Sequence, residues 1–180
     1  MGIRNKTHLP LIVFAACFLF LLSGCRPQAP QIPSQRKGEA PKTDSAALAL
    51  MELNRQLAQA ADRQLVQLVQ EQAEPYALYE AGTWMTILDR GDETSAAPAY
   101  DEQWTVHMQI YDLSGRMLVD SEASYRIGRH ELPEAVDENI GELRRGGKAR
   151  LMAPWYAAYG LKGTENIPPY ENVIIEIELK

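Results

Sequence analysis

Two neighbouring stretches near the C-terminus decide the fold: RGGKARLMAPWYAAYG at residues 145–160 and IPPYENVIIEIEL at residues 167–179. In the second stretch, aliphatic residues at 173, 175, 177 and 179 alternate with glutamates at 176 and 178. This period of two predicts a strand over 173–179 with one buried face. Residues 148–153 predict a second strand, and the prolines and glycines of 154–169 predict a long loop between the two.

Further strands precede these two. Apolar residues at 104, 106, 108 and 110 alternate with polar ones, which predicts a strand with one buried face. Other strand-like segments are 82–88, 116–121 and 125–128, with a turn at Ser114-Gly115. Apolar side chains at 136, 140 and 143, after a proline at 133, predict a short helix over 133–143. Many strands around one short helix indicate an α+β fold with an antiparallel sheet.

The segment before the strands predicts a long amphipathic helix over residues 44–74. It contains no glycine or proline, and one stripe with a period near 3.6 runs through Leu50, Leu53, Leu57, Ala61, Leu65 and Leu68. We interpret the stripe as docking on the chain's own domain; the alternative is a homodimer formed through the same stripe. Residues 25–43 carry four prolines among polar residues and predict an extended linker.

The first 25 residues predict a targeting segment. Arg4 and Lys6 precede an apolar run over 9–22, which is short for a bilayer-spanning helix and suits a signal peptide. Leu-Ser-Gly-Cys at 22–25 resembles the bacterial lipobox, which implies a lipoprotein signal peptide over 1–24 and lipid, including palmitate-type chains, on Cys25. The alternative is a plain signal peptide with an incidental cysteine.

These features indicate where the protein works. An acylated Cys25 anchors the chain in a membrane of the bacterial cell envelope, since several acyl chains bind stably. No acidic cluster follows the cysteine, which favours the outer membrane with the protein facing the periplasm.

Composition excludes several classes of function. The formal net charge is −6 and the isoelectric point is near 5.1, which argues against nucleic-acid binding. Two cysteines and three histidines cannot build the usual structural zinc site, so we expect no metal and no cofactor. Residues 141–149 depart from a phosphate-binding loop, and there is no Gly-x-Ser-x-Gly elbow. Acidic pairs such as Asp137-Glu138 fit the solvent side of a helix.

The two C-terminal stretches resemble the C-terminal half of FKBP-type peptidyl-prolyl isomerases. The Gly-x-Lys/Arg-Ala strand, the Ala-Tyr-Gly loop, Ile-Pro-Pro and the terminal strand ending in Glu-Leu occur in order. The likeness reaches back to Tyr76. Gly82-Thr83-Trp84, the turn at 111–115 and the lipobox are similar to the FKBP-like lipoproteins of Bacteroidetes, which include the gliding-motility-associated lipoprotein. The resemblance implies an FKBP-like twisted half-barrel over 76–180, wrapped around one short helix and preceded by the long helix.

The resemblance also implies a pocket that binds proline and the residues that form it. Asp120 matches the family's pocket aspartate if one residue is inserted after Gly115, and Tyr159 matches its loop tyrosine; both are expected to be catalytic. Leu132 and Ile167 match pocket aliphatic residues. A tyrosine beside a glycine loop is equally compatible with turn packing.

Other family positions carry different residue types here, which implies a pocket without the rigid aromatic box. Met108 stands where the family has a strand tyrosine, and Leu118 or Val119 stands where it has the phenylalanine before the aspartate. Val136 replaces the pocket-floor tryptophan, and Ile175 replaces the last-strand phenylalanine. Pro133 falls at the position whose backbone N–H binds a ligand carbonyl in the family, and proline has no N–H. Val136 and Ile175 also lie on core periodicities, which favours a packing role for both.

Three hypotheses of function follow. The first is a peptidyl-prolyl cis-trans isomerase of the cell envelope that assists the folding of exported, proline-containing polypeptides. The second is a catalytically weak or inactive FKBP-like lipoprotein that binds chains or scaffolds a complex. The third is a structural lipoprotein whose long helix drives dimerisation. Loss of isomerase activity on pocket substitution separates the first two, and concentration-dependent mass tests the third.

Overall fold

The computed structural model describes residues 45–180, within a compact unit that spans Asp44–Lys180. The expected signal peptide, the expected lipid attachment at Cys25 and the expected linker lie outside the described residues. Within the described part, no helix is both long enough and apolar enough to cross a membrane.

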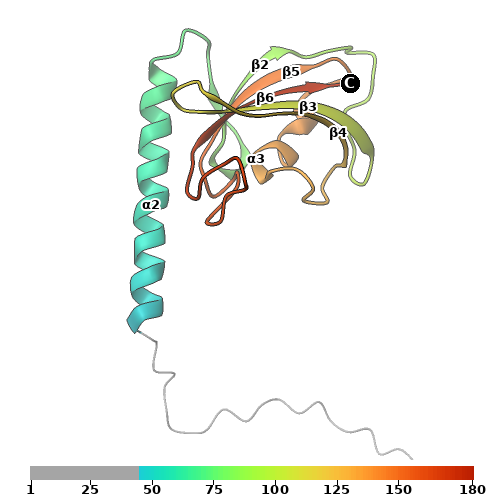
Figure 1. Ribbon diagram of the computed structural model, residues 1–180. Helices are drawn as coiled ribbons and strands as arrows, with labels where there is room; N and C mark the ends of the chain where they lie inside the picture. The colour runs from blue at the N-terminus through green and yellow to red at the C-terminus, as the bar shows by residue number, and fades with distance from the viewer. Residues whose placement is uncertain (1–44) are drawn as a thin grey trace, which may run out of the picture. The chain divides into compact units, whose positions relative to one another are not determined.

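A six-stranded antiparallel sheet forms the body of the domain (Figure 1). In spatial order its strands are β1 (Ala77–Leu78), β2 (Trp84–Asp89), β5 (Lys148–Ala153), β6 (Val173–Leu179), β3 (Gln103–Asp112) and β4 (Met117–Arg126). Every neighbouring pair is antiparallel. The α+β fold expected from the alternating strands is therefore confirmed.

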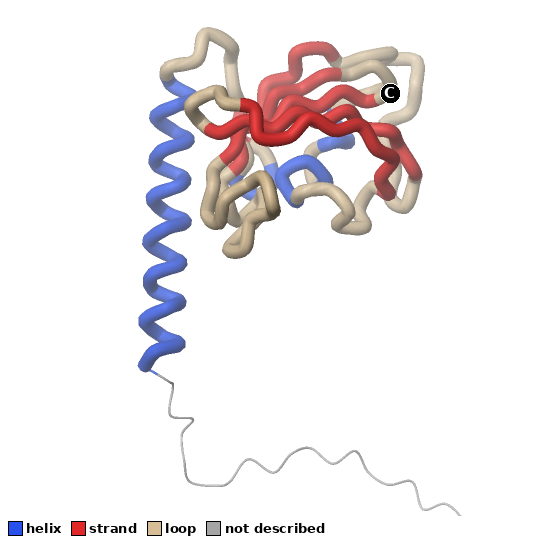
Figure 2. The backbone as a smooth tube through the Cα atoms, in the orientation of Figure 1, coloured by secondary structure: helices blue, strands red, loops and turns tan. Residues whose placement is uncertain are grey.

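One face of this sheet carries the hydrophobic core. Val106, Met108 and Ile110 of β3 are buried, and so are the alternate residues Val173, Ile175, Ile177 and Leu179 of β6. The short helical segments that follow β4 lie against this face (Figure 2), so we call it the covered face. The period of two in the sequence is thus the pattern of burial in the sheet.

The helix expected over 133–143 is two shorter pieces, α3 (Glu134–Asp137) and a 3-10 turn (Ile140–Glu142). Asn139 separates them: its side-chain amide donates to the carbonyl of Ala135 at 2.8 Å, and its backbone N–H donates instead to Val136. This side chain competes for the carbonyl that a continuing helix would use. The apolar side chains at 136, 140 and 143 are nevertheless all buried, as their spacing indicated.

The strands β3 and β4 form a long hairpin, so the two segments predicted at 116–121 and 125–128 are mostly one strand. Asp112 closes the hairpin because its buried carboxylate accepts hydrogen bonds from Ser114 and Arg116. These bonds, that of the Ser114 hydroxyl first, hold the pKa of Asp112 well below its usual range. The pairing shifts by one residue between Ile110 and Tyr111.

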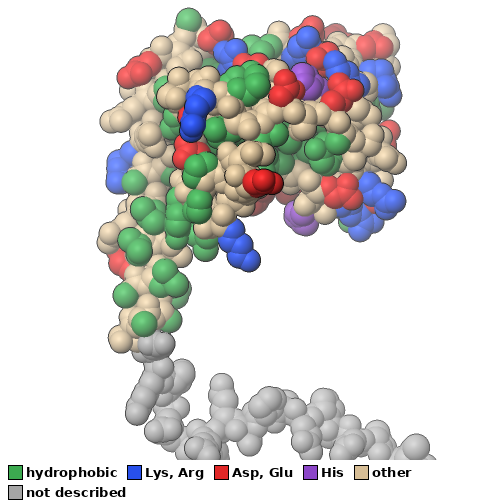
Figure 3. Space-filling model, viewed as in Figure 1, with side chains coloured by type: hydrophobic (Ala, Val, Ile, Leu, Met, Phe, Trp, Pro, Cys, Tyr) green, Lys and Arg blue, Asp and Glu red, His purple; other side chains and the backbone are tan. Residues whose placement is uncertain are grey.

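The helix α2 (Ser45–Gln70) precedes the sheet and ends four residues before the predicted boundary. Its stripe is buried in the C-terminal half, at Ala61 and Leu65. In the N-terminal half Leu50 and Leu53 are 56% and 49% exposed, and Figure 3 shows hydrophobic side chains on this part of the helix. The stripe therefore covers the chain's own domain over only part of its length.

Candidate functional site

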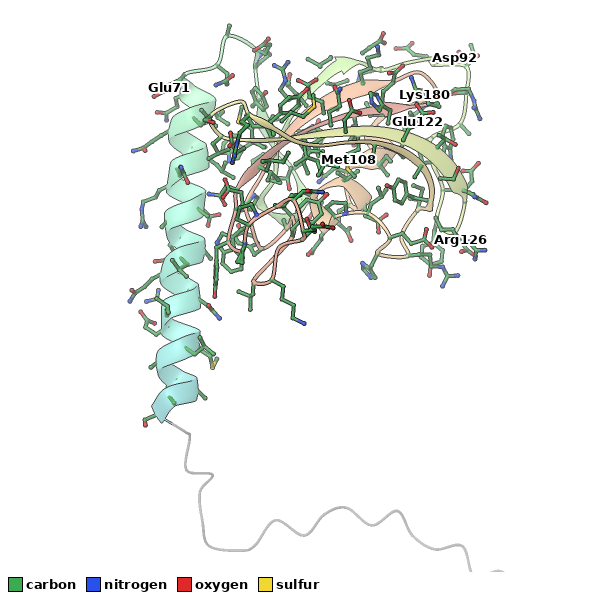
Figure 4. The ribbon with its side chains drawn as sticks, viewed as in Figure 1. Glu71, Asp92, Met108, Glu122, Arg126 and Lys180 are labelled. Atoms are coloured by element: carbon green, nitrogen blue, oxygen red, sulfur yellow. The ribbon has the colours of Figure 1, made fainter. Side chains whose placement is uncertain are left out.

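A pocket of about 500 Å³ opens on the covered face of the sheet. Met108 from the middle of β3 forms part of its wall (Figure 4), and most of the other lining groups are aromatic or aliphatic. The lining residues are Met108, Tyr125, Glu131, Leu132, Pro133, Tyr156, Ala158, Tyr159 and Gly160. Three parts of the fold thus contribute: the β3–β4 hairpin, the segment before α3 and the loop after β5.

Backbone hydrogen bonds fix the loop after β5 against α3. The N–H of Ala135 donates to the carbonyl of Ala157 at 2.8 Å, which joins α3 to the loop. Within the loop, Gly160 donates to Trp155 at 2.7 Å, and Tyr170 donates to Gly160 at 3.1 Å. These bonds hold the loop residues that line the pocket at a defined distance from Leu132 and Pro133.

Tyr159 presents a protonated hydroxyl to the pocket. Burial, and secondarily the neighbouring Tyr125, raise the pKa of Tyr159 well above its usual range. Its hydroxyl makes no hydrogen bond to any other residue in the part of the chain that is described. The group is therefore a hydrogen-bond donor at neutral pH that the fold leaves available for a ligand.

A buried carboxylate supports the segment that carries Glu131 and Leu132. Asp137 is only 8% exposed, and it accepts hydrogen bonds from the N–H groups of Gly128 at 2.8 Å and His130 at 3.2 Å. The expectation that Asp137 faces solvent on a helix is therefore wrong. Proline at 133 starts the short helix so that Asp137 points back to the preceding loop rather than outward.

The structure places Asp120 on the opposite side of the sheet from the pocket. Its side chain is 48% exposed and bonds to His107 at 2.8 Å and to Gln109 at 2.9 Å, both on the face opposite Met108. The bond from Gln109 first, and then that from His107, lowers the pKa of Asp120. The expectation that Asp120 lines the pocket is thus corrected.

The position of Asp120 on the opposite face follows from the pairing register of β3 and β4. Gln109 pairs with Asp120, while Ile110 pairs with Val119 and Met108 pairs with Ser121. Because side chains alternate between faces, a displacement of one residue exchanges the two faces of a strand. On β4 the side chains that share the face of Met108 are Val119, Ser121, Ala123 and Tyr125, and none of these four is acidic.

The remaining predicted pocket residues divide into wall and core. Met108, Leu132, Pro133 and Tyr159 come together in the pocket wall. Val136, Ile167 and Ile175 are almost completely buried in the hydrophobic core, and Leu118 is half-buried against it. The core periodicity of positions 136 and 175 was therefore the more informative signal for those two residues.

Sequence reasoning did not assign five of the lining residues to the pocket: Tyr125, Glu131, Tyr156, Ala158 and Gly160. Tyr125 belongs to β4, which was expected to be broken before it, and Tyr156 lies in the segment that was predicted only as a long loop. Glu131 is a charged group at the pocket, and its carboxylate accepts the N–H of Arg126 at 2.8 Å. Its place next to Leu132 in the chain was the available signal.

The site contains no cluster of the kind that holds a metal. Within residues 45–180, no three histidine, cysteine, aspartate or glutamate side chains come close enough to bind an ion. The pocket instead offers an apolar surface, one carboxylate, and the phenols of Tyr125 and Tyr159, which bond to no other residue in the described part of the chain.

Comparison with known proteins gives the family of this domain. Residues 95–180 match the sequence family described as FKBP-type peptidyl-prolyl cis-trans isomerase. Residues 95–180 are an FKBP-type domain. The segment spans β3 to the C-terminus and therefore includes every lining residue of the pocket.

Solved structures share the fold of the FKBP-type domain at low sequence identity. FkpA from Escherichia coli is 16% identical with a TM-score of 0.58, covering 98% of this chain and 72% of that one. A peptidyl-prolyl cis-trans isomerase from Pseudomonas syringae pv. tomato is 23% identical with a TM-score of 0.57, and the match covers 69% of this chain and 92% of that one. The N-terminal domain of FKBP42 from Arabidopsis thaliana is 18% identical with a TM-score of 0.52, and the match covers 61% of this chain and 92% of that one.

One curated protein is similar in sequence over a short segment. The 46 kDa FK506-binding nuclear protein of Spodoptera frugiperda is 35% identical over 57 residues. The match covers 31% of this chain and 14% of that protein. The match therefore concerns less than a third of this chain and a small part of that protein.

Proposed function

We propose that this protein is a peptidyl-prolyl cis-trans isomerase whose site is the pocket on the covered face of the sheet. The observation that carries the proposal is the free, protonated hydroxyl of Tyr159 in an apolar wall with Met108 and Leu132. Membership of residues 95–180 in the FKBP-type family supports the same activity.

The chemistry needs no nucleophile. Rotation about an X-Pro bond crosses a barrier of about 18–20 kcal/mol because amide resonance is lost in the twisted state. An apolar wall that excludes water favours the less polar twisted amide, and a donor placed for its carbonyl stabilises that state selectively. Met108 and Leu132 supply the apolar surface and Tyr159 the donor, while Pro133 has no N–H to contribute.

Substitution of Tyr159 tests this assignment. We expect Tyr159→Phe to lower kcat/KM for an X-Pro peptide about tenfold, because it removes one hydrogen bond from the twisted state and keeps the ring. Asp120→Ala is the matched control: it lies on the other face and should leave kcat/KM within about twofold. Equal activity of Tyr159→Phe and wild type, or loss of activity in Asp120→Ala, would contradict the assignment.

The second candidate is a binding module with weak or no catalysis. It is favoured by the pocket's aliphatic side chains, in particular Met108, and by the missing N–H at Pro133. Proline-peptide binding without acceleration of isomerisation, in a folded sample, would select this candidate.

We also propose that the protein works in the bacterial cell envelope on exported polypeptides, anchored through Cys25. The support is the sequence at 1–25, with its basic start, apolar run and Leu-Ser-Gly-Cys ending. Palmitate labelling of the expressed chain, with Cys25→Ala as control, tests the anchor. An unlabelled wild-type chain would rule it out.

The exposed half of the stripe on α2 supports a homodimer as part of this proposal. Leu50 and Leu53, which lie one turn apart on the stripe, are 56% and 49% exposed. Sedimentation of the wild type and of a Leu50→Gln/Leu53→Gln variant tests it. A monomer at all concentrations would exclude dimerisation through this surface.

A further inference from the structure

One wall residue of the pocket is held by the helix that precedes the FKBP-type domain. Tyr156 lines the pocket, and its hydroxyl donates a 2.6 Å hydrogen bond to Oδ1 of Asp62 on α2. Asp62 stands 94 residues earlier in the chain and outside residues 95–180, which match the family. Contacts of the pocket therefore reach beyond the matched domain.

The ring of Tyr156 is held on two further sides. The ring of Trp155 meets it edge-on, with centroids 5.5 Å apart and an interplanar angle of 85°. At Gly82, an added Cβ would lie only 2.6 Å from the Tyr156 hydroxyl oxygen. A side chain at position 82 would thus collide with Tyr156. The tyrosine sits between α2, the turn at Glu80–Gly82 and its own loop.

The hydrogen bond from Tyr156 to Asp62 is a charge-assisted one. Partial burial first, and then the carboxylate of Asp62, raise the pKa of Tyr156 well above its usual range, so the phenol remains a donor. A hydroxyl that donates to a carboxylate forms a shorter and stronger bond than a neutral pair does. This bond therefore limits the positions that the Tyr156 ring can take in the pocket wall.

We infer that Asp62 of α2 is a positioning residue for the proline pocket, because it holds Tyr156 in the wall that the substrate contacts. The inference rests on the proposed function for its substrate. It makes α2 part of the functional unit rather than only a spacer or a surface for another copy.

The neighbouring contact between α2 and the same loop supplies a matched control. Tyr170 donates to Oδ1 of Asn54 at 3.4 Å, but Tyr170 does not line the pocket. Asp62→Ala and Asn54→Ala each remove an acceptor for a loop tyrosine from the same helix. Both changes favour helix formation, so neither is expected to melt α2.

The experiment compares the full-length chain, kept in mild detergent, as wild type, Asp62→Ala, Asp62→Asn, Tyr156→Phe, Asp62→Ala/Tyr156→Phe and Asn54→Ala. The probe is the peptide Ala-Leu-Pro-Phe, with KM and kcat determined separately. A second readout needs no peptide: the methionine methyl groups are labelled with carbon-13, and the Met108 resonance reports on the pocket wall.

We expect Asp62→Ala and Tyr156→Phe each to raise KM about three- to tenfold with kcat within about twofold, and the double variant to add nothing further. Asp62→Asn keeps an acceptor and should rescue KM, while Asn54→Ala should match wild type. The Met108 resonance should move in Asp62→Ala and stay in Asn54→Ala.

Failure of the inference and failure of the proposed function give different results. If the wild type is active, and Asp62→Ala leaves both KM and the Met108 resonance unchanged, the inference about Asp62 is overturned while the proposed function stands. A wild type that neither binds nor isomerises the peptide would overturn the proposed function. In that case a Met108 resonance that moves in Asp62→Ala still supports the link from α2 to the pocket, and one that does not move overturns it.

Discussion

At the scale of single residues, the pocket depends on a few polar side chains with distinct roles. The Tyr159 hydroxyl is free to donate to a ligand. Tyr156 donates a hydrogen bond to Asp62, and Asp137 accepts hydrogen bonds from the backbone of the preceding loop. Only the first is placed to donate to a substrate carbonyl. The other two residues fix the positions of segments that form the pocket wall.

Asp137 gives a test of wall support. Asp137→Asn retains one oxygen acceptor instead of two, so we expect the free energy of unfolding to fall by about 1–2 kcal/mol. The amide resonances of Gly128 and His130 should shift because these groups donate to the carboxylate. Urea unfolding and amide spectra measure both effects.

The control is the neighbouring Glu138→Gln. Glu138 is exposed, and its side chain makes no hydrogen bond within the described chain, so stability should change by less than about 0.5 kcal/mol. Equal effects of the two substitutions would show that the carboxylate of Asp137 does not support the loop.

At the scale of elements, sequence periodicity was reliable where one face of a strand is buried. The strands at 148–153 and 173–179 were predicted with the bounds that the structure has, because their alternating residues are the core. The edge strand β4 buries no residue fully, so its hydrophobic pattern was too weak to show that it is continuous.

The misplaced Asp120 has a related cause. The choice of one inserted residue after Gly115 decided which face of β4 the aspartate occupied, and composition offers no signal for that choice. The pairing of Gln109 with Asp120, set by the irregularity between Ile110 and Tyr111, is a property of the hairpin in three dimensions. Likewise, the break at Asn139 depends on a side-chain bond that spacing alone does not reveal.

The hairpin turn makes a prediction about pH. The folded-state pKa of Asp112 lies below its unfolded value, so the stabilisation it provides is present above about pH 4 and is lost as the pH falls toward the folded pKa. We expect the urea midpoint to decrease from about pH 5 to about pH 2, and to decrease less in Asp112→Asn, which cannot ionise. Parallel pH profiles for the two proteins would contradict this role.

At the scale of the whole molecule, the FKBP-type domain and α2 form one unit. Three side-chain hydrogen bonds join the helix to the loop region that follows β5: Tyr156 to Asp62, Tyr170 to Asn54 and Asn172 to Gln64. An ion pair at 3.8 Å links Arg150 of β5 to Glu74 just beyond the helix. The turns of α2 before Asn54 make none of these contacts, and they carry the exposed Leu48, Leu50 and Leu53.

The most direct measurement of the central claim is the rate of a proline-limited refolding reaction with and without this protein. The account predicts acceleration at substoichiometric amounts, and a much smaller acceleration by Tyr159→Phe. No acceleration at stoichiometric amounts, with a protein whose spectrum shows the folded domain, would contradict the claim that the pocket catalyses isomerisation.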